Sequence, residues 1–283
     1  MARFVMRLLA RVPLRALHAL GALLGWSIYL GSPTYRRNLR RNMAQAGLSD
    51  RAPRRAAIAS AGRMVAELPA IWMRPREQVM RLVRSFDEHG LIAAARARGQ
   101  AIVFLTPHQG CFEITAQAIA ERVPITAMYR PPKLAFLARL TLEGRGKRNV
   151  RLAPTDRSGV REMLAALKRG ESVGILPDQV PGEGEGEWAD FFGRPAYTMT
   201  LAMKLARRPG TTALLVFGER LPRGAGYAVH IREMPEALPG EGDARRLNRA
   251  LEVQLRECPG QYLWGYNRYK QPRGAPPPPE AAA

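Results

Sequence analysis

Cysteine is scarce in this chain. The 283 residues include only Cys111 and Cys258. Two cysteines supply neither a zinc-ligand spacing nor a disulfide framework. Because disulfide-rich chains are typical of oxidising compartments, we expect this protein to work where thiols stay reduced.

Acidic residues and lysine are also scarce in the first part of the chain. No Asp or Glu precedes Asp50 and the first Lys is Lys133, whereas eight Arg lie within the first 49 residues. The whole chain has a formal net charge of +20. Such a surface attracts polyanions, whether nucleic acid, anionic lipid headgroups or an acidic protein. A base-composition bias of the genome would explain part of this charge equally well.

Signatures of nucleic-acid binding are missing as well. The sequence has no helix-turn-helix, zinc-finger or aromatic RNA-binding pattern, and its most basic segment adjoins an apolar run. We therefore expect no nucleic-acid partner. Hydrophobic residues make up 46% of the chain, which excludes a disordered protein and provides the core of one large domain.

The first 45 residues combine a basic stripe with an apolar run. Arginine recurs every four residues from Arg3 to Arg15, which on a helix makes one basic face, and residues 16–35 carry no charged side chain. A signal peptide would need a small-residue cleavage site, which is poor here. A transmembrane helix needs about 20 apolar residues, which this segment barely supplies. An interfacial helix needs a basic and an apolar face, and residues 1–24 have both. We predict a membrane anchor over residues 1–45, with an ordinary buried helix as the alternative.

Apolar runs alternate with amphipathic segments along the rest of the chain. Strands are expected at 101–106, 123–129, 172–176, 211–217 and 227–231, and helices at 50–73, 87–97, 113–122, 134–145, 156–169, 196–207 and 241–257. This alternation predicts an α/β fold, in which a central, mostly parallel mixed sheet is flanked by helices. Residues 46–270 would form this domain, and the Pro- and Ala-rich residues 271–283 a disordered tail.

A histidine and a glutamate lie where the strand at 101–106 meets the next helix. His108 follows the strand directly, at the end where α/β folds place their sites, and Glu113 begins the helix. On one continuous helix these side chains would point about 140° apart, but a bend at Gly110 can bring them together. A histidine held by a carboxylate is an oriented general base, and free N–H groups in this loop could bind an oxyanion. A structural histidine is the alternative, and Cys111 is better read as a small apolar filler than as a nucleophile.

Four further segments accompany His108 and Glu113 along the chain. They are residues 129–132, 176–179, 191–195 with Thr198, and 261–264 leading to 267–270. Together they resemble the late acyltransferases of lipid A biosynthesis, the lauroyl and myristoyl transferases, within the bacterial lysophospholipid acyltransferase superfamily. Cys111 and Phe112 stand where that family usually has Asn and Trp, and the closing motif also departs from its usual form. These departures leave the acceptor and the preferred chain length open.

The resemblance implies a glycerol-3-phosphate acyltransferase-like fold and an O-acyl transfer without an acyl-enzyme, metal or redox cofactor. His108 would take the proton from a hydroxyl of a 3-hydroxyacyl chain on a phosphorylated glucosamine lipid, and the oxygen would attack the thioester of acyl–acyl carrier protein. Glu113 would steady the imidazolium. The expected partners are acyl carrier protein, the glycolipid and membrane lipids, at the cytoplasmic face of a bacterial inner membrane. The substrate-binding residues that it implies are Arg130, Asp178, Gln179, Arg194 and Arg268.

Several alternatives remain open from the sequence. The same chemistry would suit another acceptor, such as a lysophospholipid or a glycosylated phospholipid. A non-catalytic membrane-binding protein would tolerate the loss of His108. Arg130 could be a surface ion-pair residue instead of a phosphate ligand. Asp178 could orient Arg130 or the acceptor, or cap a turn.

Overall fold

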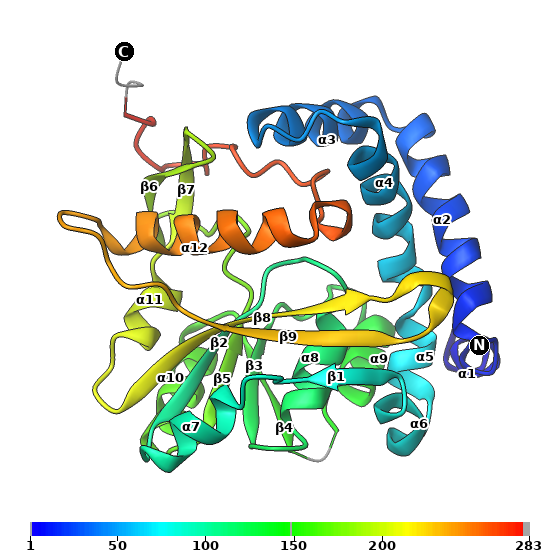
Figure 1. The fold of residues 1–283 in the computed structure, drawn as a ribbon, viewed down its shortest axis with the longest axis horizontal. Coiled ribbons are helices and arrows are strands. Elements are labelled where there is room, and N and C mark those ends of the chain that lie inside the picture. The colour runs from blue at the N-terminus through cyan, green and yellow to red at the C-terminus, as the bar shows by residue number, and fades with distance from the viewer. Residues whose placement is uncertain (1, 148, 280–283) are drawn as a thin grey trace.

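A seven-stranded sheet forms the centre of the molecule (Figure 1). The computed structural model describes residues 2–147 and 149–279. The strand order is β1-β9-β8-β2-β5-β3-β4, in which only the neighbours β8 and β9 are antiparallel. The strands are β1 (Val83–Phe86), β2 (Ala101–Leu105), β3 (Ile125–Tyr129), β4 (Val150–Pro154), β5 (Ser172–Ile175), β8 (Thr211–Arg220) and β9 (Tyr227–Glu233). The predicted α/β class with a mostly parallel central sheet is confirmed.

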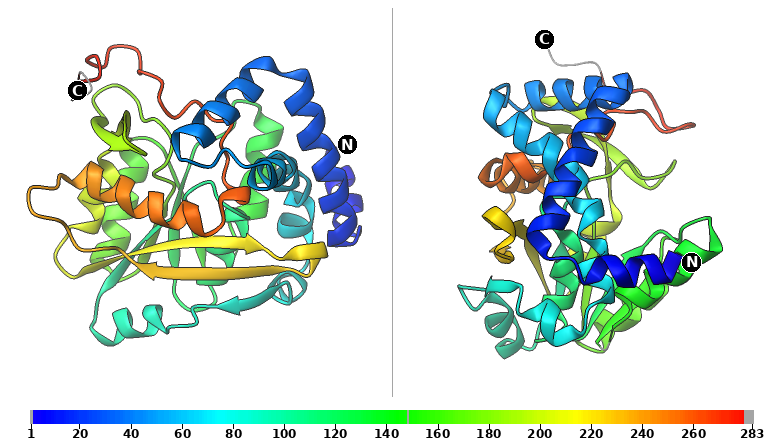
Figure 2. Two further views of the ribbon diagram at one scale, coloured as in Figure 1. Left: turned by 45° about the horizontal axis from the view of Figure 1, so that its top comes forward. Right: turned by 90° about the vertical axis from the view of Figure 1, so that its right-hand side faces the viewer.

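Helices cover both faces of this sheet (Figures 1 and 2). In β2, Val103 and Leu105 pack in one core cluster and Ile102 and Phe104 in the other, because successive side chains point to opposite faces. The first cluster lies against α3 (Pro33–Gln45), α4 (Arg51–Ala66), α10 (Arg157–Lys168), α11 (Leu201–Ala206) and α12 (Asp243–Glu257). The second lies against α5 (Leu68–Met73), α6 (Arg76–Met80), α7 (Leu91–Ala97) and α8 (Phe112–Ile119). Helix α9 (Ala135–Arg145) lies beside α5 and β4, and short 3₁₀ turns occupy Pro222–Gly224 and Pro259–Gln261.

The first two helices are joined closely to the rest of the fold. They are α1 (Ala2–Ala10) and α2 (Leu14–Gly31). Gly25 of α2 lies so near α4 that an added Cβ would meet the carbonyl oxygen of Ile58 at 2.1 Å, and a Cβ on Gly62 would meet that of Gly21 at 1.9 Å. The glycines of the apolar run therefore allow two helix backbones to touch. None of the helices in the described residues has both the length and the apolar character that a membrane crossing requires.

Two strands stand apart from the main sheet as a hairpin, β6 (Gly186–Phe191) and β7 (Arg194–Met199). The helix expected at 196–207 is therefore wrong for its first turn, because Ala196 to Met199 pair with β6, and α11 begins only at Leu201. The helix expected at 50–73 is divided at Glu67, with Pro69 near the start of α5.

The last described residues run along this hairpin. Trp188 Nε1 donates to the carbonyl oxygen of Pro276 at 2.9 Å, and Gln271 donates to that of Ala275 at 2.8 Å. The final four residues of the expected tail, 280–283, lie outside the described part of the chain.

Candidate active site

A cavity of about 1000 Å³ opens at the carboxyl ends of β2, β5, β3 and β4. It reaches both faces of the sheet. Ala127 and Leu152 line it from the face that α8 covers, and Met128 and Ile175 line it from the face that α10 covers. His108 also lines this cavity, which fits the rule that open α/β sheets bind ligands beyond the carboxyl ends of their strands.

His108 is fixed by Asp178 from the loop after β5. The Nδ1 atom of His108 lies 2.9 Å from Oδ1 of Asp178, and the backbone N–H of His108 donates to Oδ2 at 3.0 Å. Because an ionised carboxylate only accepts, Nδ1 carries the proton and Nε2 presents a lone pair. The amide of Gln179 donates to that Nε2 at 3.3 Å. The ring is thus oriented, and its basic nitrogen, Nε2, lies beside Gln179 in the cavity wall.

The carboxylate of Asp178 is ionised although it is buried. Burial by itself would raise its pKa, but the charge of His108 and the hydrogen bonds from His108 outweigh burial and lower the pKa below its ordinary value. A fixed negative charge beside Nδ1 is what a histidine needs to become an imidazolium during proton transfer.

Glu113 lines the same cavity but has other partners. Its Oε2 accepts from Nε1 of Trp72 at 3.0 Å and from Nε of Arg145 at 2.9 Å, and Nη2 of Arg145 pairs with Oε1. Among the hydrogen bonds of the described residues, none joins Glu113 to His108. Glu113 lies in the first turn of α8 and faces α5 and α9, because the chain turns between the two residues.

The turn between His108 and Glu113 depends on Gly110. Its φ is +60°, and an added Cβ would meet the carbonyl oxygen of Gly218 at 2.0 Å. The N–H of Gly110 donates to Gln261 O at 2.8 Å, and its carbonyl accepts from Arg220 Nη2 at 2.6 Å. Gly110 therefore shapes the loop, while its N–H is engaged and does not point at a substrate in this conformation.

A buried ionic cluster contacts this loop at the carbonyl oxygen of Gly110. Nη2 of Arg220 lies 2.7 Å from Oε1 of Glu67, and Nη1 donates to Ser60 at 2.9 Å. Oε2 of Glu67 also accepts from the hydroxyl of Tyr227 at 3.0 Å and lies 3.1 Å from Nε2 of His18. Burial by itself would raise the pKa of Glu67, but Arg220 and His18 lower it to about 2. The cluster therefore links α2, the α4–α5 junction and β8 to the loop between His108 and Glu113, the candidate catalytic loop.

Cys111 is fully buried next to this cluster. Burial raises the pKa of its thiol well above the ordinary value, with a further contribution from the charge of Glu67. A thiol that stays protonated is a poor nucleophile, in keeping with the filler role expected from the sequence.

The remaining expected binding residues separate into two groups. Gln179 and the exposed Arg130 line the cavity. Arg194 stacks its guanidinium over Tyr269 at 4.7 Å, and Arg268 is only 2% exposed. Neither belongs to the cavity lining.

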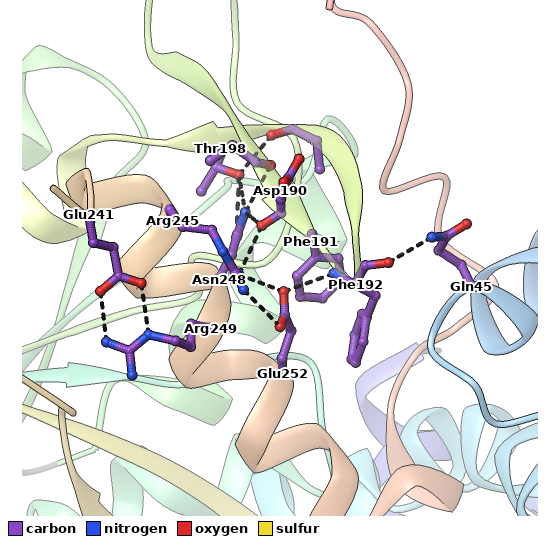
Figure 3. Close-up of polar contacts among 12 residues, drawn as sticks. Gln45, Asp190, Phe191, Phe192, Thr198, Glu241, Arg245, Asn248, Arg249 and Glu252 are labelled. Atoms are coloured by element: carbon purple, nitrogen blue, oxygen red, sulfur yellow. Dashed lines mark hydrogen bonds and ion pairs between the residues drawn. The ribbon is translucent and has the colours of Figure 1, made fainter. Parts of the chain in front are cut away.

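Arg268 instead holds the β6–β7 hairpin. It donates to the carbonyl of Tyr197 and to Thr198, each at 2.8 Å. Several side chains of α12 hold the hairpin as well (Figure 3). From α12, Glu252 accepts from the N–H of Phe192 at 2.8 Å, and Asn248 donates to the carbonyl of Asp190 at 3.0 Å. The segment at 191–195 together with Arg268 and Tyr269 therefore supports the hairpin in this conformation, whereas Lys270 lines the cavity.

Sequence reasoning missed four basic residues of the cavity, Arg145, Arg157, Lys204 and Lys270. Arg145 ends a predicted helix, and no local pattern distinguishes it from a surface arginine. Within the described residues, no group of three His, Cys, Asp or Glu could hold a metal ion.

Comparisons with a family model and with individual relatives point to the same family. The model of the family described as bacterial lipid A biosynthesis acyltransferase matches residues 1–271. The lipid A biosynthesis lauroyltransferase of Escherichia coli (strain K12) is 29% identical over 224 residues, which cover 77% of this chain and 72% of the relative. The lipid A biosynthesis palmitoleoyltransferase of the same strain is 27% identical over 216 residues, which cover 75% of this chain and 69% of the relative. A lipid A biosynthesis acyltransferase of Haemophilus influenzae is 26% identical over 179 residues, 61% of this chain and 55% of the relative.

Proposed function

This chain belongs to the bacterial lipid A biosynthesis acyltransferase family, and on that premise we propose that it transfers a fatty acyl chain from acyl–acyl carrier protein to a hydroxyl of a 3-hydroxyacyl chain on a lipid A precursor. It is an acyltransferase; the donor, the acceptor position and the mechanism are the proposal. The observation that carries the mechanism is the orientation of His108 by Asp178 at the cavity wall.

In the proposed reaction, His108 is the general base. Nε2 takes the proton of the acceptor hydroxyl after that hydroxyl displaces the amide of Gln179, and the oxygen attacks the thioester carbonyl. The positive charge that forms on the imidazole lies beside the Asp178 carboxylate. We therefore assign the role of steadying the imidazolium to Asp178, in place of Glu113. Collapse of the tetrahedral intermediate expels the thiolate of the carrier, which receives the proton from His108.

Glu113 then has a different role in the proposal. It fixes the guanidinium of Arg145, which lines the cavity with His108. A cation held in place before the reaction stabilises negative charge that develops on a carbonyl oxygen, because it needs no reorganisation at that moment. Arg145 would supply this charge, and Glu113 together with Trp72 would hold it in position.

The composition of the cavity wall suits both substrates. Apolar side chains from both sheet faces fit an acyl chain, as Leu152 and Ile175 illustrate. Arg130, Lys204 and Lys270 also line the cavity, and such cations bind phosphate groups of a glycolipid. The net charge of +20 favours an acidic carrier protein and anionic lipid alike.

We propose that the protein works at the cytoplasmic face of the inner membrane. Helix α2 leaves Leu20, Leu23 and Leu30 more than half exposed, next to the arginines that begin at Arg36. Apolar side chains bordered by cations are typical of a surface that lies in the headgroup region of an anionic bilayer.

An acyl-transfer assay by mass spectrometry tests this function. Detergent-solubilised protein would receive a panel of acyl–acyl carrier proteins with a Kdo-bearing lipid A precursor, beside the His108→Ala variant. A mass gain of one acyl group that is lost in the variant supports the reaction and the base. The absence of a gain with every donor would exclude this acceptor and direct the assay to lysophospholipids and glycosylated phospholipids. A gain that survives in the variant would refute the mechanism.

A further inference from the structure

Helix α9 is apolar on the side that faces away from the protein. Its inner side buries Leu140, Thr141 and Gly144. Its first turn exposes Phe136 and Leu137, by 53% and 39%, and Leu142 is exposed on the side opposite the buried residues. A helix that is apolar around its circumference but covered on one side only leaves a surface in water that a partner would bury.

Helix α1 presents the same kind of surface next to it. Phe4 is 71% exposed and Leu8 is 55% exposed. The guanidinium Nε of Arg3 lies 3.1 Å from Oε2 of Glu143, which joins α1 to α9 directly. Both helices lie at the same end of the molecule in the right-hand view of Figure 2. We call the exposed apolar side chains Phe4, Val5, Leu8, Leu134, Phe136, Leu137 and Leu142 the α1–α9 surface.

Cations surround this surface. Arg3, Arg7 and Arg11 of α1 are exposed, and so are Lys133 and Arg139 on the α9 side. The acidic residue of α9, Glu143, is paired with Arg3. Exposed apolar side chains among cations fit an anionic lipid surface, which accepts the apolar groups between its headgroups and attracts the positive charge.

The same helix also forms part of the cavity wall. Arg145, the last residue of α9, lines the cavity and pairs with Glu113. The preceding Gly144 packs so closely on Trp72 that an added Cβ would meet its ring at 2.4 Å, and Trp72 donates to Glu113. The eleven residues of α9 thus connect the exposed apolar side chains with the Glu113–Arg145 pair of the cavity wall.

We propose that the α1–α9 surface docks on an anionic bilayer and that the lipid acceptor passes along α9 from the leaflet into the cavity. This inference rests on the proposed function, because it assigns a route to its acceptor. It extends the membrane contact from the N-terminal helices to a helix within the α/β domain. Docking through α9 would bring the cavity mouth to the headgroups, so that the acceptor need not leave the membrane fully.

The test compares charged substitutions on this surface with a matched control. Phe136→Asp and Leu137→Asp place a carboxylate at exposed positions in the first turn of α9. Leu238→Asp does the same at an equally exposed position, 54%, in the connection between β9 and α12. That connection lies at the opposite end of the molecule in Figure 1. Circular dichroism melting curves would check that all three variants fold.

Two readouts separate docking from catalysis. The first is co-sedimentation of the full chain with vesicles of phosphatidylglycerol and phosphatidylethanolamine, against vesicles of neutral phosphatidylcholine. The second is the ratio of acyl transfer to an acceptor embedded in those anionic vesicles over transfer to the same acceptor in detergent micelles. Burial of one large apolar side chain changes a partition constant by roughly tenfold or more, so the α9 variants should lose about that factor in both readouts.

Each outcome decides between the two proposals. A loss in Phe136→Asp and Leu137→Asp with no loss in Leu238→Asp supports docking through α9. Equal behaviour of all three variants, or equal binding of the wild type to neutral and anionic vesicles, overturns it. Wild-type transfer in micelles without vesicle binding would overturn the docking and leave the proposed function in place. Vesicle binding that depends on α9 without transfer to any lipid would support the surface and refute the function.

Discussion

The imidazole of His108 and the carboxylate of Asp178 meet through two contacts, 2.9 Å at Nδ1 and 3.0 Å at the backbone N–H of His108. One contact fixes the ring and its tautomer, and the other fixes the strand end that carries the ring. The carboxylate also keeps its negative charge, since His108 holds the pKa of Asp178 below its usual range. In the proposed mechanism the two residues would therefore act as one unit in proton transfer.

Asp178→Asn should lower kcat by about 10²–10⁴-fold with little change in the KM for the acceptor. The amide has nearly the same shape, but it carries no charge and can present N–H groups to Nδ1, which favours the wrong tautomer. Steady-state acyl transfer measured by mass spectrometry would show the effect. Asp243→Asn, which alters a surface ion pair with Arg207, is the matched control. A kcat for Asp178→Asn equal to that of the control would mean that Asp178 does not assist His108.

Glu113→Gln and Arg145→Met should each reduce activity, and the double variant should lose little more than either one. The reason is that Glu113 holds the guanidinium of Arg145 in the cavity wall. Arg145→Met removes this positive charge, and Glu113→Gln removes the carboxylate that fixes its position. A double-mutant cycle on kcat measures this coupling. Losses that multiply would show two independent roles and would contradict the assignment of Glu113 as the support of Arg145.

Gly110→Ala should displace the catalytic loop. The added methyl group would meet Gly218 O at 2.0 Å and would also occupy a backbone conformation with φ +60°. Gly240 has φ +73° with nothing within 4 Å of an added Cβ. Gly240→Ala therefore reports the backbone cost alone, about 1–2 kcal/mol. We expect a much larger loss of both thermal stability and kcat in Gly110→Ala, and equal losses in the two variants would show that the close approach to β8 is unimportant.

The stability of the fold should depend on acid pH through Glu67. Its pKa is lowered to about 2 in the folded state, so its stabilising contribution is complete above its unfolded value near pH 4.3 and is lost as the pH falls towards 2. Urea denaturation at pH 7, 5, 4 and 3 would show this loss in the wild type. Glu67→Gln should be less stable at pH 7 by about 3–5 kcal/mol, because Arg220 keeps its charge without a partner, and its stability should change less between pH 5 and pH 3. An unchanged slope in the variant would assign the acid dependence to other carboxylates.

The central strands could be predicted because burial on both faces leaves a continuous apolar run, as in β2, where all five residues are buried. The edge strands β1 and β4 were missed for the opposite reason. Each lies at one end of the strand order and has an exposed arginine in its middle, Arg84 or Arg151. The β6–β7 hairpin was missed because its turn places Phe192, a residue without the freedom of glycine, at φ +51° before Gly193.

Local patterns also located His108 and Glu113, since His108 follows a buried strand and Glu113 begins the next helix. Asp178 was expected as a substrate-binding residue, but its contact with His108, and that of Arg145 with Glu113, could not be found in the same way. Asp178 lies 70 residues from His108, and Arg145 lies 32 residues from Glu113. Such contacts depend on which strands become neighbours in the sheet. β5 pairs with β2 although β3 and β4 lie between them in the chain.

The backbone contact of α2 with α4, through Gly21, Gly25 and Gly62, bears on how the protein could be shortened. Removal of the first two helices to obtain a more soluble fragment would expose the apolar side of α4. It would also take His18 away from Glu67, which then loses one of its buried partners behind the catalytic loop. Solubility is therefore better sought by polar replacements at Leu20, Leu23 and Leu30 on the outer side of α2, since these leave the glycine contact intact.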